Sequence, residues 1–201
     1  MNPNEVTGIV LAGGRSSRMG EDKSMMKLNG KTMVEYAIDA LRPLCGQVIV
    51  SSNQLVYEFT GCQVWQDDVK NHAPMVGIYS CLKRSSTEFN IILSCDMPLI
   101  SINLINYLLE CSLNYDITIP IHENGMIEPL CGIYKKSVTG ILKQCIAEHR
   151  FSMKEGISNA IHRFVEIDKQ LPFFAPNLFK NINTPADFEY ISIFLQGGNI
   201  S

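Results

Sequence analysis

The sequence predicts an α/β fold, a three-layer α/β/α sandwich built around a mainly parallel sheet with one antiparallel strand. Short apolar runs rich in β-branched residues alternate along the chain with segments of helical periodicity. Residues 115–134 differ, because two strand-like runs flank the turn sequence ENG, and this hairpin-like pattern is typical of antiparallel neighbours. At 201 residues, the chain predicts a single domain over residues 1–201.

The first hundred residues read as a βαβαβ alternation. The apolar run 6–12 predicts a buried strand, too short for a helix. A helix over 32–44 is indicated by apolar residues at helical spacing and by a capping box between Thr32 and Glu35. The remaining expected elements are strands at 47–52, 62–65 and 89–98 and a helix at 75–85.

The second half continues the alternation. Ser101 is placed to cap a helix that runs to about Cys111. Thr184 and Pro185 suit the N-cap and first position of the last helix. Between them we expect strands at 115–120, 126–134 and 162–168 and helices at 137–148 and 152–160.

Composition limits the class of protein. Apolar residues make up 46% and charged residues 18%, and the formal net charge of −3 gives no overall attraction to nucleic acid. The N-terminus MNPNEVTG carries no basic and apolar leader, and no apolar run approaches the ~18 residues of a membrane helix. The seven cysteines stand singly in mostly apolar surroundings, which favours reduced, buried thiols. We therefore expect a cytoplasmic protein without nucleic-acid or membrane partners.

The stretch GIVLAGGRSSRMGEDKS, residues 8–24, joins a buried strand to two glycines and then to three cations. Glycine lets main-chain N–H groups approach an anion closely, and ligands of open α/β sheets lie at the carboxyl ends of strands. The Rossmann and Walker patterns do not fit this stretch, since it contains no G-x-G-x-x-G and Lys23-Ser24 is preceded by Asp22 instead of glycine. A plain turn with a solvated surface is the alternative, but the loop length and the cations favour triphosphate binding.

The segment LAGGRSSRMGEDK resembles the signature of the molybdenum cofactor guanylyltransferases. The resemblance continues nearly to the end of the chain, in the same order, through KLNGKTMVEYAIDAL, PMVGI, LSCDMPLI, EPLCGIY and NINTPADF. It implies the nucleotidyltransferase fold with a Rossmann-like sheet, in which residues 1–100 bind the nucleotide and residues 101–201 bind the pterin acceptor. It also implies transfer of GMP from GTP to Mo-molybdopterin with release of pyrophosphate.

The resemblance implies roles for the residues of the glycine loop. Backbone groups of this loop would meet the base and phosphates, while Arg18 and Lys23 would neutralise charge on the departing pyrophosphate. Arg15 falls at a variable position of the signature, where a surface charge is at least as good a reading. The nucleotide-binding residues carried over are Leu11, Ala12, Gly13, Gly14 and Lys23.

Asp96 follows the apolar run IILSC, where a strand-end carboxylate faces the ligand crevice. It is a candidate catalytic, nucleotide-binding and metal residue, because Mg²⁺ takes one or two protein carboxylates and completes its shell with phosphate and water. The structural alternative is capping of the next helix, for which Ser101 is better placed.

Asp67 matches the acid that the family associates with guanine, since a carboxylate accepts both N1–H and the amino group of that base. The adjacent Asp68 is an alternative, as is a plain surface acid. Gly77 is the expected glycine of the next motif, also assigned to nucleotide binding. Ala73 departs from the glycine that usually precedes the proline, and a methyl group there would narrow access to the nucleotide.

For the acceptor, the resemblance points to Asn181 and Asn183, which would bind the pterin or its phosphate. Formation of a turn before the last helix is an equal reading of both asparagines. Arg150 is a weaker candidate for the phosphate, because an exposed arginine at a helix end is common.

The implied partners are GTP, Mo-molybdopterin, the cofactor Mg²⁺ and proteins that insert the finished cofactor into molybdoenzymes. Two alternatives stay open. One is a nucleotidyltransferase for another base or acceptor, such as a cytidylyltransferase acting on molybdopterin or an enzyme for a sugar or alcohol phosphate. The other is a nucleotide-binding partner without turnover, which has little need for both Lys23 and Asp96.

Overall fold

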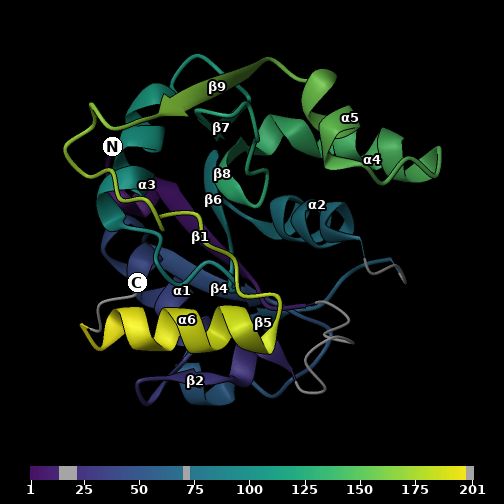
Figure 1. The fold of residues 1–201 in the computed structure, drawn as a ribbon. Coiled ribbons are helices and arrows are strands. Elements are labelled where there is room, and N and C mark those ends of the chain that lie inside the picture. Colours follow the sequence, from purple (N-terminus) through teal and green to yellow (C-terminus); the bar gives the residue numbers. More distant parts are fainter. Residues whose placement is uncertain (14–21, 70–72, 198–201) are drawn as a thin grey trace.

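A computed structural model of the chain describes residues 1–13, 22–69 and 73–197. Its main strands alternate with helices as the sequence predicts (Figure 1). The strands are β1 Val6–Leu11, β2 Lys27–Leu28, β3 Lys31–Thr32, β4 Gln47–Ser51, β5 Gln63–Trp65, β6 Phe89–Ser94, β7 Ile117–His122, β8 Cys131–Lys135 and β9 His162–Ile167. The α-helices are α1 Met33–Leu41, α2 Pro74–Arg84, α3 Ile102–Cys111, α4 Thr139–Ala147, α5 Met153–Ser158 and α6 Pro185–Leu195.

Seven of the described strands form one mixed sheet in the order β5-β4-β1-β6-β8-β7-β9. The pairs β5–β4, β4–β1, β1–β6 and β7–β9 are parallel, whereas β8 runs antiparallel to both β6 and β7. The α/β class with a mainly parallel sheet and one antiparallel strand is therefore confirmed. Because β8 enters beside β6, its preceding loop lies at the edge where β1, β4, β5 and β6 end.

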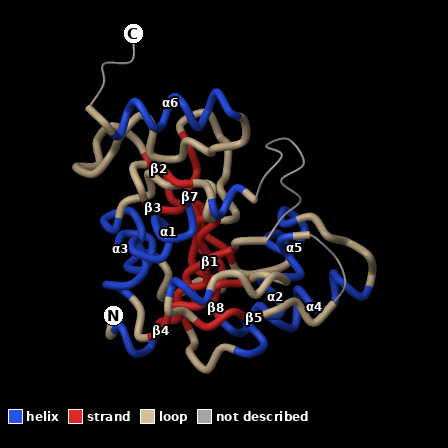
Figure 2. The backbone as a smooth tube through the Cα atoms, turned by 90° about the horizontal axis from the view of Figure 1, so that it is seen from below, coloured by secondary structure: helices blue, strands red, loops and turns tan. Residues whose placement is uncertain are grey.

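Helices cover both faces of the sheet (Figure 2). Val6 and Val10 of β1 pack against α1 and α3 in one core, while Ile9 and Leu11 pack against α2 and α4 in the other. All four side chains are at most 8% exposed, as the alternation of side chains along a strand buried on both faces requires. The three-layer arrangement predicted from the sequence is thus confirmed.

The predicted helix caps are present. Thr32 and Glu35 form the capping box of α1, and the Ser101 side chain accepts a hydrogen bond from the Leu104 N–H at the start of α3. Thr184 caps α6 with Pro185 at the first position, and Asp187 completes a second capping box. Each cap satisfies N–H groups that have no partner within their own helix.

The main difference from the prediction lies in the 126–134 strand, which begins only at Cys131. Before it, Glu128–Leu130 turns, since the Cys131 N–H donates to the Glu128 carbonyl at 3.1 Å and Pro129 has no N–H to give to a ladder. A single bridge between Ile127 and Ile121 continues the pairing. The strand predicted over 89–98 ends four residues early, at Ser94, so that Asp96 follows the strand. Other predicted elements shift by one to three residues at their ends, mostly inward, and the helix predicted to end at residue 44 finishes in the 3₁₀ turn Arg42–Leu44.

The last helix returns to the N-terminal half of the chain. In Figures 1 and 2, α6 lies beside β2, and a small apolar cluster of Leu28, Met33, Ile182 and Ile191 joins them. The segment that precedes α6 is tied to the sheet because the Ile182 N–H donates to the Asp96 carbonyl at 2.9 Å. No helix in the described ranges is long and apolar enough to span a membrane.

Candidate active site

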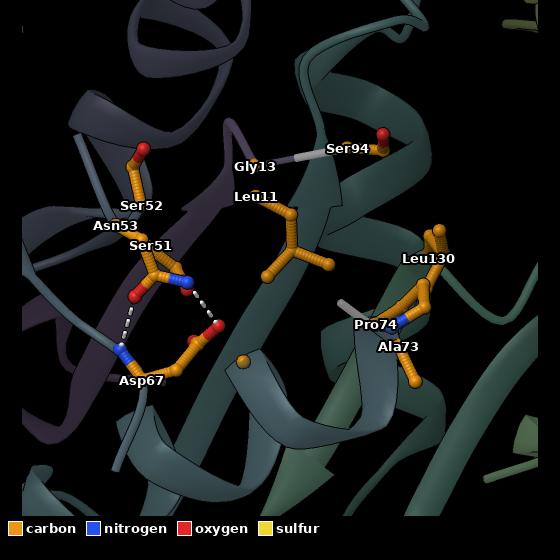
Figure 3. Close-up of a pocket in the computed structure, with 11 residues that line it drawn as sticks. Leu11, Gly13, Ser51, Ser52, Asn53, Asp67, Ala73, Pro74, Ser94 and Leu130 are labelled. Atoms are coloured by element: carbon orange, nitrogen blue, oxygen red, sulfur yellow. Dashed lines mark hydrogen bonds between the residues drawn. The ribbon is translucent and has the colours of Figure 1, made fainter. Parts of the chain in front are cut away.

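A pocket lies at the carboxyl edge of the sheet, where β1, β4, β5 and β6 end beside the start of α2 (Figure 3). Parallel strands deliver their C-terminal residues to one edge, so loops distant in sequence share this pocket. It is lined by Leu11, Gly13, Ser51, Ser52, Asn53, Asp67, Ala73, Pro74, Gly77, Ser94 and Leu130. Five of these, Leu11, Gly13, Asp67, Ala73 and Gly77, were singled out in the sequence.

The carboxylate of Asp67 is held by Asn53, which follows β4. The Asn53 Nδ2 donates to Asp67 Oδ2 at 2.8 Å, and the Asp67 N–H donates to Asn53 Oδ1 at 2.9 Å (Figure 3). The other oxygen, Oδ1, lies on the side of Gly77. This reciprocal pair fixes the orientation of a carboxylate in the pocket, as recognition of a polar base edge requires.

Asp68 lies in a different environment. Its carboxylate forms ion pairs with Lys83 at 2.8 Å and Arg84 at 2.5 Å, on the last turn of α2. These hydrogen bonds, that of Lys83 first, lower the pKa of Asp68 below its ordinary value. The two neighbouring acids therefore differ, since Asp67 lines the pocket and Asp68 anchors a helix end.

A side chain at Gly77 would crowd the polar groups of the pocket. A Cβ atom there would lie 3.1 Å from Ser51 Oγ and 3.4 Å from Asp67 Oδ1. Gly13 differs, because the nearest described atom to a Cβ would be the Ser51 carbonyl at 3.9 Å. Packing in the described parts of the chain thus leaves space at Gly13, and the space faces the pocket.

Ala73 takes the place of the expected glycine without strain. Its backbone has φ −73° and ψ 137°, an extended conformation open to any residue. Its methyl group lines the pocket opposite Ser51–Asn53 (Figure 3). The substitution changes the wall of the pocket and leaves the backbone path unaltered.

Asp96 follows β6 at the same edge. Its Oδ1 is buried and has no hydrogen-bond partner among the described residues. An uncompensated carboxylate oxygen in the interior is costly, so such an atom indicates a partner that the described residues do not supply. No group of three or more His, Cys, Asp or Glu side chains suited to a metal occurs in the described ranges, so a cation held by Asp96 would take its other ligands from substrate and water.

Lys23 joins the N-terminal loop to the C-terminal segment. Its Nζ donates to Asn183 Oδ1 at 2.8 Å, across 160 positions of sequence. The Asn183 N–H donates to Asp187 Oδ2 at 3.1 Å, within the cap of α6. Asn183 therefore takes part in the turn before α6, which is one of its two readings from the sequence, and it also contacts Lys23, whereas its binding of the acceptor stays a prediction.

Tyr57 is a residue whose importance the sequence did not reveal. It is fully buried, and its hydroxyl lies 2.8 Å from Ser24 Oγ, 2.9 Å from the Ala12 carbonyl and 3.3 Å from Asp22 Oδ2. Burial raises the pKa of this phenol, so it stays protonated. Tyr57 thereby connects Ala12 to Asp22 and Ser24, the residues that flank Lys23 in sequence.

The remaining candidates fall in separate places. Asn181 Nδ2 donates to the Phe179 carbonyl at 3.4 Å within the segment before α6. Arg150 pairs with Glu148 after α4, on the side of the molecule where α4 and α5 pack on α2 (Figure 1). Gly14, Arg15 and Arg18 lie outside the described residues. All seven cysteines are free thiols, and burial raises the pKa of Cys81 to about 12, which keeps it protonated.

Comparison with known proteins agrees with this geometry. Residues 8–163 match the family model described as the MobA-like NTP transferase domain. The chain belongs to this family. Members are nucleotidyltransferases, and the match covers the pocket, Lys23 and Asp96.

Two curated relatives extend nearly over the whole chain. A probable molybdenum cofactor guanylyltransferase of Carboxydothermus hydrogenoformans is 30% identical and covers 92% of this chain and 93% of its own. A protein of the same name in Flavobacterium johnsoniae is 32% identical, with coverage of 86% and 91%. The crystal structure of molybdopterin-guanine dinucleotide biosynthesis protein A from Archaeoglobus fulgidus has TM-score 0.79 at 21% identity, covering 95% of this chain and 99% of that one, and shows the shared fold.

The contacts of Tyr57 predict a positioning role in this nucleotidyltransferase. Tyr57→Phe keeps the buried ring and removes only the hydroxyl, so Asp22–Ser24 loses its tie to Ala12. We expect kcat to fall roughly tenfold because Lys23 is misplaced, since a displacement of about 1 Å can cost up to ~100-fold. The dissociation constant for the nucleotide, measured by titration calorimetry, should change less than about twofold.

Tyr36→Phe is the matched control, because its hydroxyl donates to the Leu28 carbonyl at 3.2 Å outside the pocket. It should lower the melting temperature without a comparable loss of kcat. Equal losses of kcat in the two variants would show that Tyr57 serves only stability.

Proposed function

We propose that this chain transfers GMP from GTP to Mo-molybdopterin, forming molybdopterin guanine dinucleotide and releasing pyrophosphate. The observation that carries the proposal is the oriented carboxylate of Asp67 in a pocket whose lining includes Ser94, two residues before Asp96. The names of the curated relatives support the same activity. Residues 1–100 supply most of the nucleotide site in this proposal, and residues 101–201 supply the acceptor site.

Guanine fits the pocket by its hydrogen-bonding edge. Asp67 accepts from N1–H and the amino group, while Asn53 holds the carboxylate in place at 2.8 Å. Adenine presents no such pair of donors on that edge and leaves the carboxylate unpaired, which is the strongest form of selectivity a binding site has. Leu11 supplies an apolar wall beside it, and Gly77 allows the base to approach Asp67.

The transfer step needs positioning and charge neutralisation rather than a protein nucleophile. A phosphate oxygen of the acceptor attacks the α-phosphorus of GTP, a new P–O bond forms, and the bond to the bridging oxygen breaks with pyrophosphate as leaving group. Lys23 is proposed to stabilise charge on that leaving group with its ammonium group, which donates to Asn183 Oδ1 at 2.8 Å. Arg18 is proposed to act with Lys23.

Asp96 fits the role of a Mg²⁺ ligand, because its buried Oδ1 has no protein partner in the described parts of the chain. When bound, Mg²⁺ would supply neutralisation of the phosphate oxygens. Asp96 would hold the ion beside the pocket. The segment before α6 lies next to Asp96, because the Ile182 N–H donates to the Asp96 carbonyl at 2.9 Å. Asn181 and Asn183 of that segment are proposed to contact the acceptor, with Arg150 a more remote candidate for its phosphate.

The experiment that tests the proposal is pyrophosphate release from GTP, ATP, CTP and UTP in turn, with Mg²⁺ and with Mo-molybdopterin present or omitted. We expect release with GTP alone, and only when the acceptor is present. Release with CTP would instead indicate a cytidylyltransferase. Absence of release with every nucleotide would contradict turnover and favour a binding protein.

The difference between the two neighbouring acids gives a second prediction. Asp67→Asn places a donor against the donors of guanine and should raise the KM for GTP roughly 10- to 100-fold, as expected when a buried hydrogen bond is lost. Asp68→Asn removes only the ion pairs to Lys83 and Arg84 and should leave KM within about twofold. Steady-state kinetics on the pair decides, and similar KM values in both variants would remove Asp67 from base recognition.

The unpartnered carboxylate of Asp96 gives a third prediction. Asp96→Asn preserves the shape and removes the charge, so Mg²⁺-dependent turnover should fall on the order of 100-fold or more. Asp39→Asn is the control. Asp39 lies on α1 and forms a partly exposed ion pair with Lys31, so its loss should leave kcat unchanged. Near wild-type kcat in Asp96→Asn, across a Mg²⁺ titration, would contradict the assignment.

A further inference from the structure

A second cavity lies beyond Asp96, where β7 and β9 end against the segment that leads to α6. It measures about 340 Å³, within the range of about 300–1,000 Å³ typical of small-molecule sites. Its walls include His122, Glu123, Ile167, Asn177, Phe179 and Lys180. We call it the β7–β9 groove.

The β7–β9 groove is connected to the catalytic residues through one short segment. Phe179 lines the groove, Ile182 donates to the Asp96 carbonyl at 2.9 Å, and Asn183 accepts from Lys23 at 2.8 Å. An extended chain advances at most ~3.6 Å per residue, so the Cα atoms of residues 179 and 182 lie within about 11 Å of each other. A ligand in the groove is thus within one small-molecule length of Asp96.

One wall of the groove is aromatic and firmly supported. The ring centroids of His122 and Phe179 lie 4.4 Å apart, and the angle between the ring planes is 34°. Behind them, His122 Nε2 lies 3.1 Å from Glu128 Oε1, and both side chains are mostly buried. Burial raises the pKa of Glu128, and Asp96 adds to this effect while His122 opposes it, so the pair is electrostatically linked to the catalytic edge.

The lining of the groove also contains polar side chains. Glu123 offers acceptor atoms, whereas Asn177 and Lys180 offer donors. A flat ring with adjacent N–H and amino donors next to a carbonyl would satisfy both kinds of group. Guanine and pterin share this arrangement, and in the proposed reaction guanine already has Asp67 at the other end of the site.

We propose that the β7–β9 groove holds the pterin ring of the acceptor, its face against Phe179 and its amino edge toward Glu123. This inference rests on the proposed function and assigns its second substrate. The phosphate end of the acceptor then points along residues 179–183 toward Lys23 and Asp96. The sheet edge would thus bind two similar heterocycles, one at each end, with the reacting phosphates between them.

The test uses the full chain and pterin-6-carboxylate, a probe with the ring and no phosphate, whose fluorescence reports stacking. Phe179→Ala should weaken binding of the probe roughly tenfold. Phe179→Tyr, which keeps an aromatic face, should restore it. Phe173→Ala is the matched control, since this half-buried ring lies outside the groove, with its centroid 5.6 Å from that of the Tyr107 ring. The affinity of this variant for the probe should stay within about twofold of wild type.

Glu123→Gln supplies a test that does not depend on removing an apolar side chain, because Glu123 is exposed. It should weaken the probe several-fold and raise the KM for molybdopterin, with an unchanged dissociation constant for GTP. No binding of the probe to wild type, or equal affinities in Phe179→Ala and Phe173→Ala, would overturn the assignment.

The pyrophosphate assay separates the two levels of the argument. If wild type releases pyrophosphate with GTP and molybdopterin, but the Phe179 and Glu123 variants bind the probe as tightly as wild type does, only the assignment of the groove is wrong. If wild type releases none with any nucleotide, the proposed transfer is wrong, and the assignment of the groove to an acceptor is wrong with it.

Discussion

The parallel pairing of β1 with β4 and β6 is the constraint on which the rest of the structure depends. Its register aligns Leu11 with Ser51 and with Ser94, so three loops leave the sheet at one level. Gly8 allows this strand to lie under α1, because a Cβ there would come within 3.1 Å of Leu41 Cδ1. A shift of one residue would exchange the faces of β1 and remove Leu11 from the pocket.

The C-terminal segment completes a site that the sheet begins. Asp187 accepts hydrogen bonds from Asn183 and Thr184, and the ion pair with Lys180 at 3.0 Å helps lower the pKa of its carboxyl to about 2. The helix cap of α6 therefore fixes the conformation of the segment that contacts Lys23. In this way a local element at residue 187 positions Asn183, the residue that accepts the hydrogen bond from Lys23.

Periodicity, turn residues and caps were sufficient to predict the order of elements, the antiparallel strand and the cap of α6, because these depend on neighbours close in sequence. The pocket residues Leu11, Gly13, Asp67 and Gly77 were found through motifs. Asn53 and Tyr57 were not, since each acts through contacts to residues 14 to 45 positions away that no local pattern encodes. The same limit left Asp67 and Asp68 as alternatives until ion pairs with α2 separated them.

Electrostatics explains why the proposed chemistry needs cations at this edge. Burial raises the pKa of the Cys95 thiol, the charges of Asp96 and Asp22 add to this shift, and Lys23 acts in the opposite direction. Asp96 also raises the pKa of Glu128. In the proposed reaction two anionic phosphates meet at this edge, and carboxylates there disfavour their approach. Under the proposed function, binding of both phosphates therefore calls for positive charge beyond Lys23, and the proposed sources are Arg18, which lies outside the described residues, and a divalent cation on Asp96.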